Sequence, residues 1–182
     1  MTSLASHDPS APVSAISRAL RQALQAGDGL VEWLPIGVYS CDVEGSLVHY
    51  NRRAAELWGR SPAIGNGQHR FCGARGAYRP NGEPIPLAEA PMAELLRTAR
   101  PIRDRELILE RPDGTRLAVL ANLDPLFDED GTLVGGVNCF QDITARKLAE
   151  DRLREREHWY RDLLQALPAA IYTTDAEGRI TF

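Results

Sequence analysis

The chain has 182 residues, of which 43% are hydrophobic and 25% charged, and its formal net charge is −4 at pH 7. This length accommodates one domain and part of another, and it can bury a core without disulfides or a structural metal. A negative net charge argues against a nucleic-acid partner, because phosphate binding requires a basic face. Cys41, Cys72 and Cys139 lie far apart with no C-x-x-C spacing, which predicts reduced thiols in the cytoplasm.

The start of the chain carries neither an export signal nor a membrane segment. Residues 1–11 lack the basic and then apolar regions of a signal peptide, and their small polar composition predicts disorder. No window reaches the roughly 18 apolar residues that a membrane helix requires. Ile16, Leu20 and Leu24, at steps of four, predict a helix over residues 12–29. This helix either packs on its own domain or pairs two copies of the chain.

The segment LPIGVYSCDVEGSLVHYNRRAAELWG predicts two strands followed by a short helix. We expect strands over residues 37–42 and 47–50, with Gly45 in the turn between them. Asn51 precedes a helix over residues 52–58, and asparagine at this position accepts hydrogen bonds from the free N–H groups of the first turn. We therefore expect Asn51 to be the N-cap.

The middle of the chain is less regular. Residues 60–86 are rich in glycine and proline, and residues 78–83 within them predict a hairpin turn. A helix is expected over residues 87–99, with Met92 on its inward face and Pro101 just beyond its end.

Three consecutive strands are predicted within residues 105–144, where apolar residues alternate with polar or smaller ones at period two. Pro112-Asp113-Gly114 and Asp130-Gly131 provide the two turns between the strands. The third strand ends in Asp142-Ile143-Thr144, and a charged helix follows. Either Asp142 or Thr144 can cap this helix.

Together these segments resemble a PAS sensory domain. That family shows a Leu-Pro, a strand, an Asp-x-x-Gly turn, a strand and an Asn before a helix, and later a hairpin like Arg111-Pro112-Asp113-Gly114 and an exit like Asp142-Ile143-Thr144. The resemblance implies an α+β fold over residues 30–144, with a five-stranded antiparallel sheet and helices across one face. It also implies that residues 12–29 form a cap helix that helps two protomers associate.

Residues 145–166 predict a charged helix with a sparse apolar stripe of Leu153, Tyr160 and Leu163. Such a helix either lies on its own domain or forms a parallel two-helix linker with a second copy. The Asp-Ile-Thr entry favours the linker, because in PAS proteins this triplet leads into a signalling helix.

The end of the chain repeats an earlier segment. LPAAIYTTDAEG, which begins at Leu167, matches LPIGVYSCDVEG, which begins at Leu34, at six identical positions and at a constant offset of 133 residues. A repeat at this spacing marks tandem domains rather than a solenoid. We therefore expect residues 167–182 to be the truncated start of a second PAS domain, in a chain that is part of a longer protein.

No catalytic motif is visible, since the chain contains no P-loop, no H-E-x-x-H and no nucleophile elbow, and no enzyme activity is expected of it. By the resemblance, ligands bind between the inner face of the sheet and the crossing helices. Asn138 stands out there as a polar residue among apolar ones; it either hydrogen-bonds a small ligand or is satisfied by the local backbone. The predicted pocket side chains are Leu107, Leu109, Leu117, Val119, Ala121, Asn138 and Phe140 from the strands and Met92 from the helix.

The residues do not favour flavin or haem. Aligned with light-sensing LOV domains, a PAS branch, Leu109, Val119 and Phe140 occupy positions where amide side chains hold the flavin, and apolar residues cannot form those hydrogen bonds. His69 stands where those domains have their reactive cysteine. The helix 87–99 contains no histidine to ligate haem iron. No metal site is predicted, and the cofactor is left open.

The resemblance implies a sensory input module of a bacterial signalling protein. It would act as a homodimer and pass a ligand- or partner-dependent change through Asp142, Ile143 and Thr144 to the linker helix. The expected parent is a sensor histidine kinase of a two-component system. The alternatives are the input domain of a cyclic-di-GMP synthase or phosphodiesterase, and a ligand-free module that binds only proteins.

Overall fold

A computed structural model of the chain describes residues 29, 31–64, 70–166 and 175–180. The predicted cap helix with Ile16, Leu20 and Leu24, and also His69, lie outside these described residues. The chain divides into two compact units, Met1–Ile143 and Thr144–Phe182.

The first unit contains the short 3-10 helices η1 (Val31–Trp33) and η2 (Leu87–Glu89), the helices α2 (Arg52–Trp58) and α3 (Pro91–Thr98), and the strands β1 (Gly37–Asp42), β2 (Leu47–Tyr50), β3 (Gly76–Tyr78), β4 (Ile102–Glu110), β5 (Arg116–Phe127) and β6 (Leu133–Asp142). The second unit contains the helix α4 (Thr144–Ala166). The predicted bounds of β1, β2 and α2 are confirmed.

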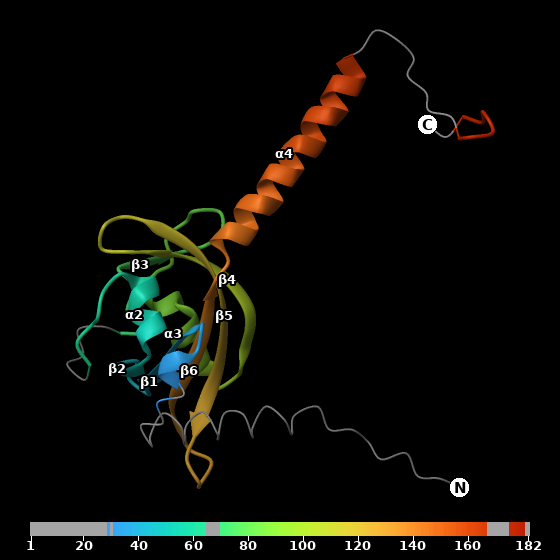
Figure 1. Cartoon of the computed structure of the whole chain (residues 1–182). Coiled ribbons are helices and arrows are strands. Elements are labelled where there is room, and N and C mark those ends of the chain that lie inside the picture. Colours follow the sequence, from blue (N-terminus) through green and yellow to red (C-terminus); the bar gives the residue numbers. More distant parts are fainter. Residues whose placement is uncertain (1–28, 30, 65–69, 167–174, 181–182) are drawn as a thin grey trace, which may run out of the picture. The chain divides into compact units, whose positions relative to one another are not determined.

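The described strands form one antiparallel sheet in the order β2-β1-β6-β5-β4-β3 (Figure 1). The sheet has six strands, and the expectation of five is wrong. The additional strand is β3, which pairs with β4 through Ala77 and Leu109 and lies within the segment predicted to be irregular. Three residues that include a glycine are too few to show a period-two pattern, so only the pairing partner reveals this strand.

The single helix expected over residues 87–99 is also corrected, because two helices are separated there by an extended residue. Ala90 has φ −56° and ψ 142°, which places it outside the helical region. Pro91 follows, and the ring of a proline disfavours helical geometry in the residue before it. The same proline begins α3 well, because its fixed φ suits the first helical position.

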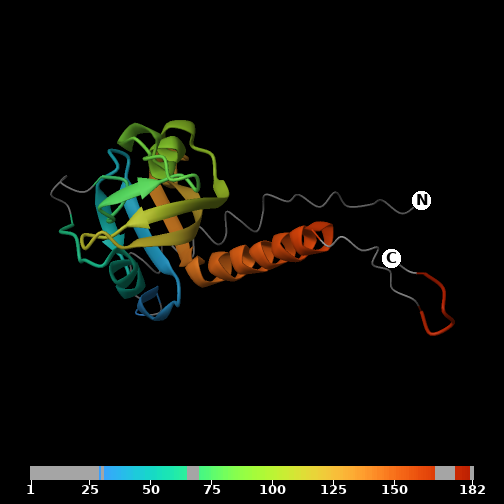
Figure 2. The ribbon, with the colours of Figure 1, turned by 90° about the horizontal axis from the view of Figure 1, so that it is seen from above.

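The core lies between the inner face of the sheet and the two helices α2 and α3 (Figure 1; Figure 2). Leu57 and Trp58 of α2 and Leu95 of α3 belong to one buried cluster with inward residues of the strands. Gly136 of β6 allows α3 to approach closely, since an added Cβ would lie 2.6 Å from Leu95. A second, smaller cluster covers the other face of the sheet and contains Val31, Val38, Leu126 and Val137.

Asn51 is the N-cap of α2, as predicted, and its fully buried amide also joins three elements. Its Oδ1 atom accepts hydrogen bonds from the backbone N–H groups of Val38 and Ala54, both at 2.9 Å. Its Nδ2 atom donates to the carbonyl groups of Val31 at 2.9 Å and Ile36 at 3.0 Å. One side chain therefore fixes η1, β1 and α2 relative to one another.

The other end of α2 is held by the β4–β5 hairpin. Arg111 donates from Nε to the carbonyl of Leu57 at 3.0 Å and from an NH2 group to the carbonyl of Glu56 at 3.3 Å. Gly59 ends the helix in the left-handed conformation at φ 69°, which glycine adopts without strain. Because both ends of α2 are anchored, the position of its last residue, Trp58, is fixed.

The described part of the sequence repeat near the end of the chain, residues 175–180, forms the same turn as its counterpart near the start of β2. The N–H of Asp42 donates to the carbonyl of Ser46 at 3.0 Å, and that of Asp175 donates to the carbonyl of Arg179 at 2.9 Å. The glycine of each turn, Gly45 or Gly178, has φ near 80°. The sequence repeat is therefore matched by a local structural repeat at this turn.

We predict that Asn51→Ala lowers the free energy of unfolding by about 3 kcal/mol or more, because it removes an N-cap and leaves buried backbone groups without partners. Denaturant unfolding of the full chain measures this change. Asn81→Ala is the matched control, because Asn81 is exposed and accepts a single hydrogen bond from Glu83. A loss below 1 kcal/mol for Asn51→Ala, equal to that of the control, would contradict the assigned role.

Candidate functional site

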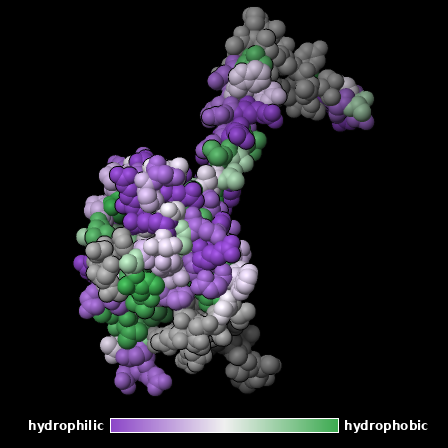
Figure 3. Space-filling view, turned by 60° about the vertical axis from the view of Figure 1, so that its left-hand side comes forward, coloured by the Kyte–Doolittle hydropathy of each residue, from purple (hydrophilic) through white to green (hydrophobic). Residues whose placement is uncertain are grey.

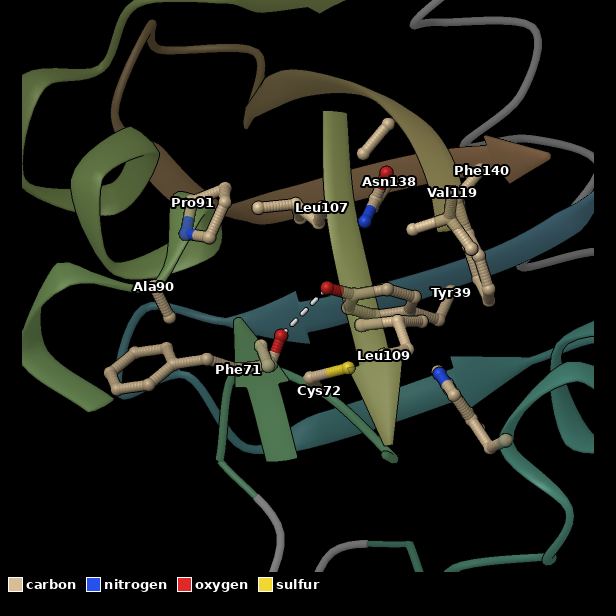
Figure 4. Close-up of a pocket in the computed structure, with 13 residues that line it drawn as sticks. Tyr39, Phe71, Cys72, Ala90, Pro91, Leu107, Leu109, Val119, Asn138 and Phe140 are labelled. Atoms are coloured by element: carbon tan, nitrogen blue, oxygen red, sulfur yellow. Dashed lines mark hydrogen bonds between the residues drawn. The ribbon is translucent and has the colours of Figure 1, made fainter. Parts of the chain in front are cut away.

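An internal cavity of about 30 Å³ lies between the inner face of the sheet and the start of α3 (Figure 4). Strands β1, β3, β4, β5 and β6 contribute to its wall, together with the end of α2 and the segment before β3. The lining residues are Tyr39, Trp58, Phe71, Cys72, Ala77, Ala90, Pro91, Leu107, Leu109, Val119, Ala121, Asn138 and Phe140.

The structure brings together most of the side chains predicted to form a pocket. Leu107, Leu109, Val119, Ala121, Asn138 and Phe140 line the cavity. Leu117 and Met92 do not; both are buried in the core beside it. Leu117 lies opposite Leu109 near the β4–β5 hairpin, and Met92 packs against Gly136. The period-two pattern finds the correct face of the sheet but does not show where along the strands the cavity ends.

Sequence reasoning missed the other half of the wall. Tyr39 could have been found, because it lies on the inward face of a predicted strand. Trp58, Ala90 and Pro91 lie in or next to helices, and no periodicity indicates that these positions face a cavity. Phe71 belongs to the irregular segment, together with Cys72, so no pattern predicts its position.

One end of the cavity is closed by aromatic rings. The ring of Trp58 stacks on that of Phe140, with centroids 5.8 Å apart and planes at 18°. Tyr39 lies at 5.3 Å from Trp58 and at 5.9 Å from Phe140, in tilted and edge-on arrangements. Gly73 makes room for Trp58, since a Cβ there would clash with the indole ring. These contacts hold the rings rigidly, so this end of the cavity is preformed.

The opposite end is less enclosed. Pro91 is buried there, but Phe71 and Ala90 are partly exposed. Figure 4 shows Phe71, Ala90 and Pro91 grouped on one side of the cavity, across from the ring of Tyr39. The cavity wall is therefore least buried on the side formed by the start of α3 and Phe71.

The Tyr39 hydroxyl is the centre of the polar contacts. It donates a hydrogen bond of 2.7 Å to the carbonyl oxygen of Phe71 (Figure 4). Burial raises the pKa of Tyr39 well above its ordinary value, the nearby thiols of Cys72 and Cys41 add to this, and the amide of Asn138 acts in the opposite direction. Burial also raises the pKa of the Cys72 thiol. Both groups are therefore uncharged at neutral pH.

Two buried polar atoms at the cavity have no hydrogen-bond partner. They are Nε1 of Trp58, a donor, and Oδ1 of Asn138, an acceptor. Nearly all buried polar groups in native proteins are paired, so each exception requires an explanation. The local backbone does not satisfy the Asn138 carbonyl oxygen, which was one of the two alternatives for this residue.

The donor set does not fit a flavin. Leu109, Val119 and Phe140, at the positions where LOV domains have amides, all line the cavity and offer no hydrogen-bonding side chain.

Within the described residues, no group of three or more His, Cys, Asp or Glu side chains is placed to hold a metal ion. No helix in the described part of the chain is long and apolar enough to cross a membrane.

The signalling elements predicted from the sequence are also described. Asp142 is the last residue of β6 and is paired with Val119 of β5. The N–H of the buried residue Ile143 donates to the carbonyl of Ala118 at 2.8 Å, and α4 begins at Thr144. On α4 itself, Leu153, Tyr160 and Leu163 are 43–59% exposed.

A family model for the PAS domain matches residues 35–145, which is more than half of the chain. Solved structures with this fold include the PAS domain of the fruit-fly ELK potassium channel, at 17% identity and TM-score 0.50, covering 69% of this chain and 97% of that one. A light-oxygen-voltage domain studied with a flavin analogue aligns at 19% identity and TM-score 0.50, covering 79% of this chain and 98% of that one. An RNA-binding light-oxygen-voltage receptor aligns at 17% identity and TM-score 0.51, covering 88% of this chain and 43% of that one.

At these identities the structural likeness shows the fold alone. No curated protein matches the sequence. The family match covers the whole segment from β1 to the start of α4, including every described strand. The chain therefore belongs to the PAS domain family.

Proposed function

We propose that this PAS domain is the sensory input module of a bacterial signalling protein and that a small molecule in the internal cavity is its input. One observation carries the proposal: the strand that leads to α4 also forms part of the cavity wall. Asn138 and Phe140 of β6 line the cavity, and a single residue, Ile143, separates the end of β6 at Asp142 from the start of α4. A ligand that contacts Asn138 therefore acts on the strand that the output helix continues.

The strand next to β6 strengthens this link. Val119 and Ala121 of β5 also line the cavity, and Val119 is paired with Asp142. The adjacent residue Ala118 accepts the hydrogen bond from Ile143. Two neighbouring strands thus connect the cavity wall with the backbone just before α4. A ligand biases this junction if it binds two arrangements of β5 and β6 with different affinity.

The helix α4 is the proposed output, paired with α4 of a second copy. Its surface is mostly hydrophilic with interspersed apolar side chains (Figure 3). Leu153 and Tyr160 occupy successive a positions of a heptad and Leu163 the next d position, whereas Arg156 falls on the d position between them. A charged residue in the seam weakens the pairing, so a small free-energy change can shift it.

Charges beside the seam favour a parallel pair. Arg152 occupies a g position and Glu157 the following e position. In a parallel pair each g residue faces the following e residue of its partner, so Arg152 faces Glu157 twice. In an antiparallel pair g residues face g residues and e residues face e residues, so this Arg–Glu pairing is lost. A parallel pair is the arrangement that can carry a change from two domains into one output.

Sequence pattern and family together support a cytoplasmic sensor histidine kinase as the parent protein. The rival is the input domain of a cyclic-di-GMP synthase or phosphodiesterase, which would use the same cavity and helix. Identifying the output domain of the parent protein would distinguish these possibilities. A ligand-free interaction module is disfavoured by the unpaired polar atoms of Trp58 and Asn138.

We predict that filling the cavity alters the junction without any added ligand. Ala121→Val adds apolar volume to the cavity wall, and we expect the exchange rate of the Ile143 amide hydrogen to change by about threefold or more, since an opening free energy shifts by several tenths of a kcal/mol. Hydrogen exchange of the full chain measures this rate. Val137→Ile is the matched control, because Val137 lies on β6 but faces the other side of the sheet. Equal exchange rates at Ile143 in all three proteins would refute the coupling.

We also predict that the pairing of α4 depends on complementary charge. Arg152→Glu or Glu157→Arg alone should raise the dimer dissociation constant about fivefold, because two symmetric ion pairs become repulsive contacts worth about 1 kcal/mol. The double variant should restore it. Sedimentation of the full chain at low salt measures the constant, with Arg154→Glu, which lies outside the seam, as the control. If the double variant is as weak as the single ones, the pair is not parallel.

A further inference from the structure

The cavity presents one unpaired donor and one unpaired acceptor, both deeply buried. Trp58 is 0% exposed and Asn138 is 6% exposed. The indole N–H of Trp58 interacts with the Cys72 thiol and opposes the rise in the pKa of that thiol. Sulfur is a weak acceptor, however, and no hydrogen bond of normal geometry forms. A buried indole N–H ordinarily has a partner, so its absence here indicates a place for one.

The identity of the unpaired atom on Asn138 follows from the hydrogen-bond network. The Tyr39 hydroxyl has a single hydrogen, which it donates to the carbonyl of Phe71. The Asn138 amide also interacts with this hydroxyl and lowers its pKa. Because the hydroxyl hydrogen is already donated to Phe71, the amide group that faces the hydroxyl must be the N–H donor. The carbonyl oxygen Oδ1 of Asn138 is then left as the free acceptor, in agreement with its lack of a partner.

The wall around these two atoms carries no charge. Among the residues that the structure describes, the lining includes no Asp, Glu, Lys, Arg or His side chain. Its titratable members, Tyr39 and Cys72, are both held in the neutral form by burial. A charged ligand would lose its hydration without gaining an ion pair, which is costly. The cavity therefore discriminates against ions.

We propose that the cavity binds a small uncharged molecule that carries both a hydrogen-bond donor and an acceptor, as a primary amide does. Its donor meets Oδ1 of Asn138, its acceptor meets Nε1–H of Trp58, and its apolar part lies against the aromatic rings. This inference rests on the proposed sensory function and specifies the class of its ligand. The volume of about 30 Å³ exceeds that needed for one water molecule and limits the enclosed part of the ligand to a few atoms.

Acetamide, acetone and acetate test the proposal, because they have nearly the same shape. Acetamide has both a donor and an acceptor, acetone has only an acceptor, and acetate is charged. The measurement is the indole N–H signal of Trp58 in the full chain labelled with ¹⁵N-tryptophan, titrated to about 100 mM because so small a ligand binds weakly. Trp33 and Trp159 are exposed and serve as internal controls for non-specific effects.

We expect acetamide to shift the Trp58 signal with saturation, acetone to bind at least about tenfold more weakly, and acetate to leave the signal unchanged. Asn138→Leu, which keeps the volume and removes the acceptor, should weaken acetamide binding about tenfold and make it similar to acetone binding. Gln141→Leu is the matched control, because Gln141 is an exposed amide of the same strand.

Equal affinity for the three probes would overturn the proposal, and so would unchanged acetamide binding in Asn138→Leu. A Trp58 signal that none of the probes moves would show that the cavity holds only water, which also overturns it. These failures are distinct from a failure of the proposed sensory function, because the exchange rate of Ile143 in Ala121→Val is measured without any ligand.

Discussion

The buried amide of Asn51 is the constraint from which the site follows. Its four hydrogen bonds join η1, β1 and α2, and they fix the direction in which α2 crosses the sheet. Arg111 holds the opposite end of the same helix through the carbonyl groups of Glu56 and Leu57. Trp58, the last residue of α2, consequently reaches the cavity with its ring packed and its N–H unpaired. The hydrogen bonds at the two ends of α2 thus determine where the Trp58 donor lies in the cavity wall.

The strand order places the cavity wall beside the segment that leads into α4. Strand β6 lies in the middle of the sheet, between β1 and β5, and all three strands contribute residues to the cavity wall. Because β1 and β5 are both hydrogen-bonded to β6, a shift of β6 at the cavity requires its neighbours to adjust with it, which a strand at the edge of the sheet would not require on its open side. The backbone continues from β6 through Ile143 into α4. The proposed binding cavity and the proposed output helix are therefore joined by a short segment of backbone.

Much of this fold follows from the sequence, and the exceptions have physical causes. The strands β1 and β2, the cap at Asn51 and the two Asp-Gly hairpins are local features, and local patterns predict them. The strand β3 and the break at Ala90 depend on a pairing partner and on a single proline. Six of the eight predicted pocket residues line the cavity, because alternation along strands is regular. Trp58, Phe71 and Cys72 reach it from non-periodic segments, so only the folded structure reveals them.

If the cavity is the input site, its occupancy changes the junction before α4. The most direct measurement follows two signals in one acetamide titration of the full chain: the indole N–H of Trp58 and the exchange rate of the Ile143 amide hydrogen. Both signals should change with the same half-saturation concentration, because one binding event causes both. Saturation of the Trp58 signal with an unchanged rate at Ile143 would show a cavity that binds but does not signal, and would contradict this expectation.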